Sequence, residues 1–252
     1  MIDLHTHVLP GIDDGCRTLK ESVDLARAAA EDGVRTLAAT PHVRFEYPTK
    51  PATMERLVGE VRAAVEEARI PIEILPGGEL ALDWLDQLTS EELGRFGLGG
   101  NPAVVLLEFP YVGWPQGLDG LVFRLQADGK TVVLAHPERN VEVQADPAPL
   151  GELVGRGVLV QVTAAALDGR LGSASRKTAR VLLDRGLAHM LASDAHTPDV
   201  RRVGLRVAAE AVGDPDLARW LTEYVPRSLV DGERLPERPS SLRRRRSLFR
   251  GR

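Results

Sequence analysis

The feature that most restricts the fold of this chain is a regular alternation of short apolar segments with longer amphipathic ones. The apolar segments are rich in aliphatic and β-branched residues, which predicts strands at residues 2–7, 34–40, 72–77, 103–109, 131–136, 158–163 and 189–193. The amphipathic segments predict helices at residues 19–33, 53–69, 81–88, 118–129, 149–157, 175–186 and 200–213. Several of these end in glycine, which is common at the end of a helix. The chain is therefore predicted to contain seven βα units.

Apolar strands separated by helices are typical of a parallel sheet with helices on its outside, either an open sheet or a closed barrel. The polar residues favour the barrel. A histidine or a carboxylate stands at, or just beyond, the carboxyl end of six predicted strands: His5 and His7, His42, Glu79, Glu108, His136, and Asp194 with His196. Six strand ends surround one point only in a closed or nearly closed barrel. We therefore predict an α/β fold with a seven-stranded βα barrel.

The histidines support this arrangement. Five of the six histidines stand at these ends, and only His189 lies at a strand start, where a structural role is expected. In the first strand His5 and His7 point to the same side, and Asp13 or Asp14 follows a few residues later. An isolated pair of this kind is equally consistent with two solvated imidazoles. The other strand ends favour a metal site.

Composition excludes several classes of protein. A hydrophobic content of 43% over 252 residues is ample for a sizeable core. No leader-like segment precedes the first strand and no apolar run is long enough to span a bilayer, so a cytoplasmic protein without stable membrane insertion is expected. The single cysteine, Cys16, excludes an internal disulfide and a thiolate zinc site. A thiol phosphatase is also disfavoured, because Glu21 and Ser22 stand where the arginine of its phosphate loop should come.

The charge distribution argues against nucleic acid as a partner. The formal net charge is −4, but residues 243–252 carry six arginines and no acid, so residues 1–242 have a formal charge of −10. Such an acidic body is unsuited to nonspecific DNA binding. We expect one domain over residues 1–235 and a disordered arginine-rich tail over residues 236–252.

The donors at the strand ends are imidazoles and carboxylates. Mixed nitrogen and oxygen donors suit manganese, iron or zinc, whereas magnesium prefers oxygen. The donors exceed what one ion can use, so two or three divalent ions are expected. Clustered ions can bind a phosphoryl group and generate hydroxide at neutral pH, which serves phosphoester hydrolysis. Arg139 and Arg201 closely follow His136 and His196 and are suited to hold phosphate oxygens.

Amidohydrolase barrels also begin with two histidines separated by one residue after the first strand. Such enzymes place a lysine after the fourth strand and a histidine after the sixth. Here these places read LLEFP and QVTAAA, so Glu108 replaces the lysine and no histidine follows the sixth strand. The chain therefore resembles an amidohydrolase less well.

The segments DLHTHVLPGIDDG, ATPH, GGEL, LLEFP, LAHPER and ASDAH occur in this order. Together they resemble the polymerase and histidinol phosphatase (PHP) superfamily, and specifically its bacterial capsule-associated, manganese-dependent protein tyrosine phosphatases. The match extends from Met1 to about Gly232, and LPGIDDG points to the tyrosine phosphatase branch. The resemblance implies a distorted seven-stranded TIM-like barrel, the PHP fold.

The resemblance also implies a trinuclear site, with manganese as the metal and Arg139 and Arg201 as the phosphate-binding residues. The implied ligands are His5, His7, Glu79 and Asp194 for the first ion, a bridging Glu79 with Glu108 and His136 for the second, and Asp14, His42 and His196 for the third. Asp13 is expected to contact the ligands without binding an ion itself. Val43 departs from the family, where many relatives have a second histidine, and residues 164–166 are alanines where relatives often have small polar residues.

The function implied is hydrolysis of protein phosphotyrosine by direct attack of a metal-bound hydroxide, in the regulation of capsular or exopolysaccharide synthesis. The expected partner is a tyrosine-rich kinase tail of polysaccharide export, while self-association stays open. One alternative keeps the barrel and the metals but hydrolyses a small phosphomonoester such as histidinol phosphate. A second alternative is an inactive scaffold, which the complete set of predicted ligands disfavours.

Overall fold

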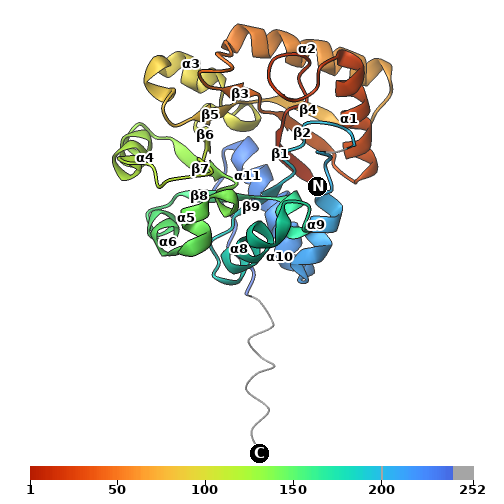
Figure 1. Cartoon of the computed structure of the whole chain (residues 1–252). Helices are drawn as coiled ribbons and strands as arrows, with labels where there is room; N and C mark the ends of the chain where they lie inside the picture. The colour runs from red at the N-terminus through yellow and green to blue at the C-terminus, as the bar shows by residue number, and fades with distance from the viewer. Residues whose placement is uncertain (200, 241–252) are drawn as a thin grey trace, which may run out of the picture.

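The computed structural model describes residues 1–199 and 201–240. Within these residues nine strands form two parallel sheets, with the orders β1-β2-β4 and β3-β5-β6-β7-β8-β9. The helices lie around the outside of the strands (Figure 1). The strands are β1 (Ile2–Thr6), β2 (Thr36–Ala39), β3 (His42–Val43), β4 (Glu73–Pro76), β5 (Glu79–Ala81), β6 (Val104–Glu108), β7 (Thr131–Ala135), β8 (Leu159–Thr163) and β9 (Met190–Ala192).

One or more helices follow every described strand except β2 and β4. The α-helices are α1 (Leu19–Glu31), α2 (Pro51–Glu67), α3 (Ser90–Arg95), α4 (Leu118–Ala127), α5 (Val141–Ala145), α6 (Ala148–Gly155), α7 (Ala164–Leu167), α8 (Gly172–Asp184), α9 (Leu205–Val212), α10 (Pro215–Arg219) and α11 (Val225–Asp231). Short 3₁₀ turns form η1 (Leu85–Gln87), η2 (Leu98–Gly100) and η3 (Pro137–Arg139), and a π turn forms η4 (Trp220–Tyr224).

The parallel α/β class is confirmed, and each of the seven predicted strand positions contains a strand. The count of seven differs from the nine described strands because β3 and β5 follow β2 and β4 after breaks of two residues. Pro41 lies in the first break and has no N–H to donate to a ladder. Gly78 lies in the second, where an added Cβ would come within 2.8 Å of the Phe96 ring. These breaks divide the hydrogen bonding between two sheets instead of one continuous seven-stranded sheet.

The carboxyl end of β1 lies beside the segment that follows β9. Thr6 forms a parallel bridge with Ala195, the His7 N–H donates to the Ala195 carbonyl (2.8 Å), and the Asp194 N–H donates to the His5 carbonyl (2.9 Å). The first and the last strands of the fold are therefore neighbours, although they belong to different sheets.

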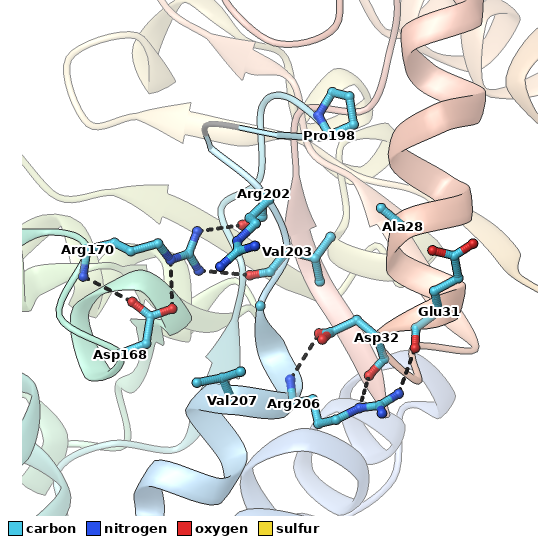
Figure 2. A pocket seen from close by; sticks show the side chains of 11 residues that line it. Ala28, Glu31, Asp32, Asp168, Arg170, Pro198, Arg202, Val203, Arg206 and Val207 are labelled. Carbon is cyan, nitrogen blue, oxygen red and sulfur yellow. Dashed lines mark hydrogen bonds and ion pairs between the residues drawn. The ribbon is translucent and has the colours of Figure 1, made fainter.

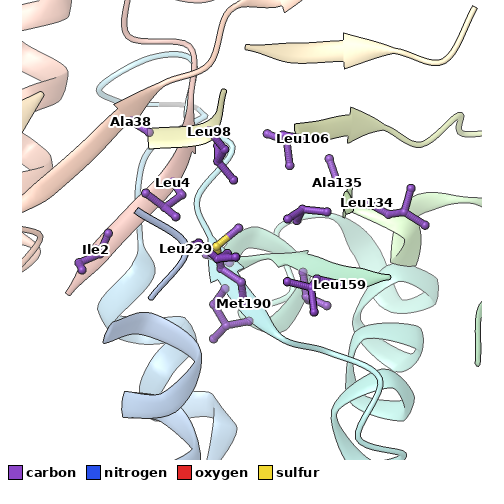
Figure 3. Close-up of a cluster of buried hydrophobic side chains, with 14 of the residues drawn as sticks. Ile2, Leu4, Ala38, Leu98, Leu106, Leu134, Ala135, Leu159, Met190 and Leu229 are labelled. Carbon is purple, nitrogen blue, oxygen red and sulfur yellow. The ribbon is translucent and has the colours of Figure 1, made fainter. Parts of the chain in front are cut away.

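Apolar side chains fill the space between the strands. Leu4, Leu106 and Leu134 come from three strands and are fully buried, and Leu98 of η2 and Leu229 of α11 join the same cluster (Figure 3). Truncating one of these leucines to alanine would cost about 2–5 kcal/mol, because a close-packed interior does not collapse onto the cavity. This rigid interior supports the loops that carry the polar residues.

Two predicted helices differ from the structure. Residues 81–88 contain the end of β5 and the turn η1, and α9 begins only at Leu205, because Gly204 adopts a left-handed conformation with φ of 66°. Val200, the predicted first residue of that helix, lies outside the described residues. The helical segments after residue 214 were not predicted; the first of them, α10, is capped by Asp214, which accepts from the N–H groups of Asp216 and Leu217.

Residues just beyond the predicted domain boundary at residue 235 still form hydrogen bonds with the domain. The Arg238 guanidinium donates to the carbonyls of Ala188 (2.6 Å) and Leu183 (2.9 Å), and the Trp220 indole donates to the Pro236 carbonyl (3.0 Å). Residues 241–252, and with them the expectation of a disordered arginine-rich end, lie outside the described residues. No helix in the described part of the chain is both long and apolar enough to cross a membrane.

Candidate metal centre

The residues predicted from six strand ends come together at the carboxyl ends of the strands. They form four overlapping groups, in each of which the possible ligand atoms lie within 4.8 Å of one another. The groups are His7, Asp14, His42 and His196; His5, Glu79 and His136; His5, His7 and Asp194; and His42, Glu79 and Glu108. All nine residues that the resemblance implied as ligands belong to at least one group.

Glu79 lies at the centre of the cluster and is fully buried. Its Oε2 atom is 3.4 Å from both His5 Nε2 and His7 Nε2, and 2.9 Å from His42 Nδ1. Its Oε1 atom is 2.8 Å from His136 Nε2. One carboxylate thus faces four imidazoles, which is the arrangement expected of a group that bridges cations.

Two aspartates face the remaining sides. Asp194 Oδ1 is 3.5 Å from His5 Nε2 and 3.4 Å from His7 Nε2. Asp14 Oδ1 is 3.4 Å from His42 Nε2 and 3.3 Å from His196 Nε2. The cluster therefore has a deep end, formed by buried Asp194, and an outer end at the partly exposed Asp14.

Buried polar atoms without a hydrogen bond converge on this point. Five of them belong to the cluster and face its interior: His5 Nε2, His7 Nε2, His42 Nδ1, His196 Nε2 and Glu79 Oε2. A buried polar atom without a partner costs about 1–3 kcal/mol, so native structures rarely tolerate several together. Coordination to cations would satisfy all five, and the mixed imidazole and carboxylate donors suit a divalent transition metal.

Neighbouring groups orient three of the imidazoles. The Nδ1 atom of His5 is 3.0 Å from Gln161 Oε1, that of His7 is 2.7 Å from Asp13 Oδ2, and that of His196 is 2.9 Å from a backbone carbonyl. Because each partner accepts a hydrogen bond, the proton resides on Nδ1 and the Nε2 lone pair faces the cluster. Asp13 also accepts from the His42 N–H (3.0 Å), consistent with its expected supporting role.

The backbone is constrained at the same place. His136 and Asp194 have φ of 40° and 52°, a left-handed conformation that is unfavourable for residues other than glycine. They are two of the three non-glycine residues with positive φ in the described part of the chain. Strained backbone of this kind persists where the surrounding structure enforces it, often at functional sites.

The charges of the cluster balance one another. Burial lowers the pKa of His42, but the carboxylates of Glu79 and Asp14 outweigh this effect and raise the pKa to about 9. Burial raises the pKa of Asp194, but the nearby His7 imidazole and the charges of other histidines hold it well below its usual range. Burial also lowers the pKa of His5 and His7, but neighbouring carboxylates again outweigh this effect and raise both values. Without a cation, a second proton on the imidazoles of His5, His7 and His42 therefore offsets the carboxylate charge, and metal binding must displace protons.

Arg139 and Arg201 lie at the rim of the cluster, where the sequence placed them. Arg139 Nη1 is 2.8 Å from Asp194 Oδ2, and its guanidinium lies 4.4 Å from the centre of the Tyr111 ring. Arg201 Nη1 is 3.2 Å from Asp14 Oδ2, and its Nη2 is 3.6 Å from Asp194 Oδ2. Both guanidinium groups can therefore reach an anion bound at the cluster.

Sequence reasoning missed three residues of this region. Gln161 carries the one amide side chain of the otherwise mainly apolar strand segment 158–163, a signal that could have identified it. Arg44, which pairs with Glu108 (2.8 Å), and Tyr111, which stacks on Arg139, lie in loops whose paths the sequence does not reveal. Val43, where the family resemblance implies a histidine in many relatives, is fully buried and pairs with Leu80 in the sheet.

Two other residues behave as the sequence indicated. The Cys16 thiol is buried, which raises its pKa to about 12, so it stays protonated and is a poor nucleophile. His189 lies outside the cluster, and its Nδ1 accepts from the Val160 N–H (3.2 Å). Burial lowers the pKa of His189 to about 4, in keeping with a neutral structural histidine.

A second charged hollow lies between α1, α9 and the loop after α7 (Figure 2). Here Arg170 binds Asp168 (2.7 Å) and the carbonyls of Arg202 and Val203, so its donors are used within the protein. The Arg206 guanidinium likewise donates to carbonyls at the end of α1. The guanidinium groups of Arg170 and Arg206 therefore have a structural role, because their donors are used by Asp168 and by the backbone.

Comparison with known proteins agrees with the site. The family described as capsular polysaccharide synthesis, CpsB/CapC, matches residues 1–215. The tyrosine-protein phosphatase YwqE of Bacillus subtilis is 32% identical over 255 residues, which cover 99% of each chain. The tyrosine-protein phosphatase CpsB of Streptococcus pneumoniae is 31% identical over 212 residues, covering 80% of this chain and 85% of the relative.

The fold agrees with a solved structure from a study of YwqE of Bacillus subtilis and CpsB of Streptococcus pneumoniae, described as metal-dependent tyrosine phosphatases. The TM-score is 0.86 at 31% identity, and the match covers 96% of this chain and 100% of the other. This chain and these relatives are therefore similar over most of their length, in sequence and in fold. This chain belongs to the CpsB/CapC family of capsular polysaccharide synthesis.

Proposed function

We propose that this protein is a metal-dependent phosphatase that hydrolyses phosphotyrosine in proteins. One observation carries the proposal: five buried, unpaired imidazole and carboxylate atoms face a common point with two arginines at its rim. That set of groups can hold cations and a phosphate dianion together. The relatives named tyrosine-protein phosphatases support the same reaction.

The proposed ligands follow the three ions that the family resemblance implies. His5, His7, Glu79 and Asp194 would hold the first, Glu79, Glu108 and His136 the second, and Asp14, His42 and His196 the third. The proximity of His42 to Glu79 and Glu108 also allows it to serve the second ion. Bound divalent ions would act as Lewis acids toward phosphoryl oxygens and lower the pKa of water. We favour manganese over iron or zinc, in line with the family resemblance.

The residues of the chain then bind and orient the phosphate. Arg139 and Arg201 would place guanidinium N–H groups on its non-bridging oxygens and stabilise the charge that develops there. The Tyr111 ring, on which Arg139 lies, restricts that guanidinium to the rim. The leaving phenolate of tyrosine has a parent pKa near ~10, so it departs more readily than an alkoxide and depends less on a general acid.

We infer that the natural substrate is a tyrosine-phosphorylated protein of polysaccharide export, such as the tail of its kinase. We also infer that the enzyme acts on it in the cytoplasm. Support comes from the family description and from the relatives' names. We further propose that the two sheets act as one distorted seven-stranded barrel around the site, in which β2 with β3 and β4 with β5 each count as one strand. The bridge between Thr6 and Ala195 supports this description, since it joins the first strand to the last.

The test measures phosphate release by the purified full-length chain from three substrates: a phosphotyrosine peptide, the matched phosphoserine peptide and histidinol phosphate. We expect turnover of the phosphotyrosine peptide to be preferred, to vanish in excess chelator and to return with Mn²⁺. Undiminished turnover in chelator would contradict the metal-dependent reaction. Preferred hydrolysis of histidinol phosphate would instead establish the small-molecule alternative.

A further inference from the structure

Arg44 lies in a tight turn that directly follows one of the proposed ligands. The turn begins after β3, which carries His42, and its ends are joined by two backbone hydrogen bonds between Arg44 and Tyr47, each of 3.0 Å. Because the turn is closed in this way, the base of the Arg44 side chain has a fixed position relative to His42.

The Arg44 guanidinium binds one oxygen of Glu108. Its Nη1 atom donates to Glu108 Oε1 over 2.8 Å, while the other oxygen, Oε2, is 3.7 Å from His42 Nδ1. The Glu108 side chain is only 13% exposed, so water competes little for the bond. The carboxylate is thus divided, with one oxygen held by the arginine and the other turned toward the group formed by His42, Glu79 and Glu108.

Two neighbours hold the guanidinium in place. It lies 5.3 Å from the centre of the Tyr47 ring, and its Nε is 3.5 Å from Glu46 Oε2. The Tyr47 ring stacks on His42, with centroids 5.9 Å apart and an angle of 13° between the planes. One turn therefore touches both Glu108 and His42, two residues of the same candidate ion site.

We propose that Arg44 is a positioning residue for the second ion: it binds Glu108 Oε1 so that Oε2 is presented to a cation shared with His42 and Glu79. This inference rests on the proposed metal-dependent function. The physical reason is that a free carboxylate rotates and can offer either oxygen, whereas a charge-assisted hydrogen bond to one oxygen fixes the orientation of the other. Lysine supplies the charge but not the planar, delocalised group, so it should replace Arg44 only in part.

The experiment measures Mn²⁺ alone, without substrate. Full-length wild type, Arg44→Met and Arg44→Lys are stripped with chelator and titrated with Mn²⁺, and free Mn²⁺ is followed by electron paramagnetic resonance. The matched control is Arg95→Met, because Arg95 forms an ion pair of similar length with Glu55 far from the cluster. Circular dichroism verifies that each variant is folded, and Arg44→Lys preserves the test if Arg44→Met does not fold.

The expected result is that Arg44→Met binds one Mn²⁺ about 10–100-fold more weakly while the tighter ions are retained. Arg44→Lys should recover part of this affinity, and Arg95→Met should bind like wild type. Wild-type Mn²⁺ affinity in both Arg44 variants would overturn the inference. A raised KM for the phosphopeptide in a separate turnover assay of the same variants would then make Arg44 a substrate-binding residue. Failure of wild type itself to bind Mn²⁺ would overturn the proposed metal dependence as well.

Discussion

Two clusters of charged residues in the described part of the chain differ in whether the protein itself supplies partners for their charged groups. In the hollow of Figure 2, Arg170 pairs with Asp168 and donates to two backbone carbonyls, so its charge is satisfied by the protein itself. At the strand ends, Glu79 Oε2 lies 3.4 Å from both His5 Nε2 and His7 Nε2, yet these inward-facing atoms lack hydrogen bonds. The second cluster thus has several buried polar atoms that can still bind a ligand, whereas Arg170 in the first does not.

The difference shows that charge alone does not identify a functional site. A paired cluster contributes to stability and has no free donors or acceptors with which to bind a ligand. A buried cluster with unsatisfied atoms costs stability, and it persists where a ligand or a reaction uses those atoms. Four changes, taken from the largest expected effect to the smallest, test whether the two regions differ in this way.

Asp194→Asn should have the largest effect on activity. It removes the carboxylate that faces His5 and His7, so at least one cation would lose a charged ligand. We expect turnover of a phosphotyrosine peptide to fall by more than the ~10–100-fold that follows loss of a residue supporting a ligand. Metal per chain, measured by elemental analysis, should fall as well. Asp168→Asn in the hollow is the control and should keep both values; retention of both in Asp194→Asn would remove the contrast.

Arg139→Met should reduce turnover by more than any loss of metal explains, although Arg139 also binds the proposed ligand Asp194. The guanidinium is proposed to stabilise charge developing on the phosphate, and loss of one such donor typically costs about 10²–10³-fold in kcat. Steady-state kinetics and elemental analysis on the same preparation separate the two effects. The matched change, Arg206→Met, removes a guanidinium from the hollow and should leave kcat unaltered. A wild-type kcat in Arg139→Met would place the phosphate elsewhere.

Arg170→Met should affect stability rather than activity. The substitution removes hydrogen bonds to two carbonyls and to Asp168, and the side chain is partly exposed, so we expect the free energy of unfolding to fall by about 1–2 kcal/mol. Urea unfolding followed by circular dichroism measures this change. Turnover per folded molecule should be that of wild type. If activity falls while stability is preserved, the hollow takes part in function and the comparison fails.

Cys16→Ala should have the smallest effect. Burial raises the pKa of this thiol to about 12, so at pH 8 it is protonated and shielded from reagents. We expect turnover within about twofold of wild type. Iodoacetamide at pH 8 should label the protein rapidly only after unfolding in urea, as mass spectrometry would show. Fast labelling of the native protein together with loss of activity would instead support a mechanism in which the Cys16 thiol is the nucleophile.

The strand positions and most of the candidate site could be predicted, because they depend on local patterns. Short, mainly apolar runs followed by His5, Glu108 or His136 are visible in the printed sequence. The breaks at Pro41 and Gly78 could not be interpreted in the same way. Proline and glycine announce an irregularity, but whether a strand ends or resumes depends on neighbours such as Phe96, which packs against Gly78 from a distant segment.

The amino-acid sequence by itself determined the donor chemistry of this protein: which strand ends carry imidazoles or carboxylates, and that the single thiol stands outside that pattern. Only the tertiary structure decided which atoms remain unpaired and which loop residues reach them. Arg44 and Glu108 are 64 positions apart in the sequence, but Arg44 Nη1 lies only 2.8 Å from Glu108 Oε1. Such pairings depend on the packing of the whole fold, because packing decides which loops come into contact. Local sequence patterns do not encode those contacts.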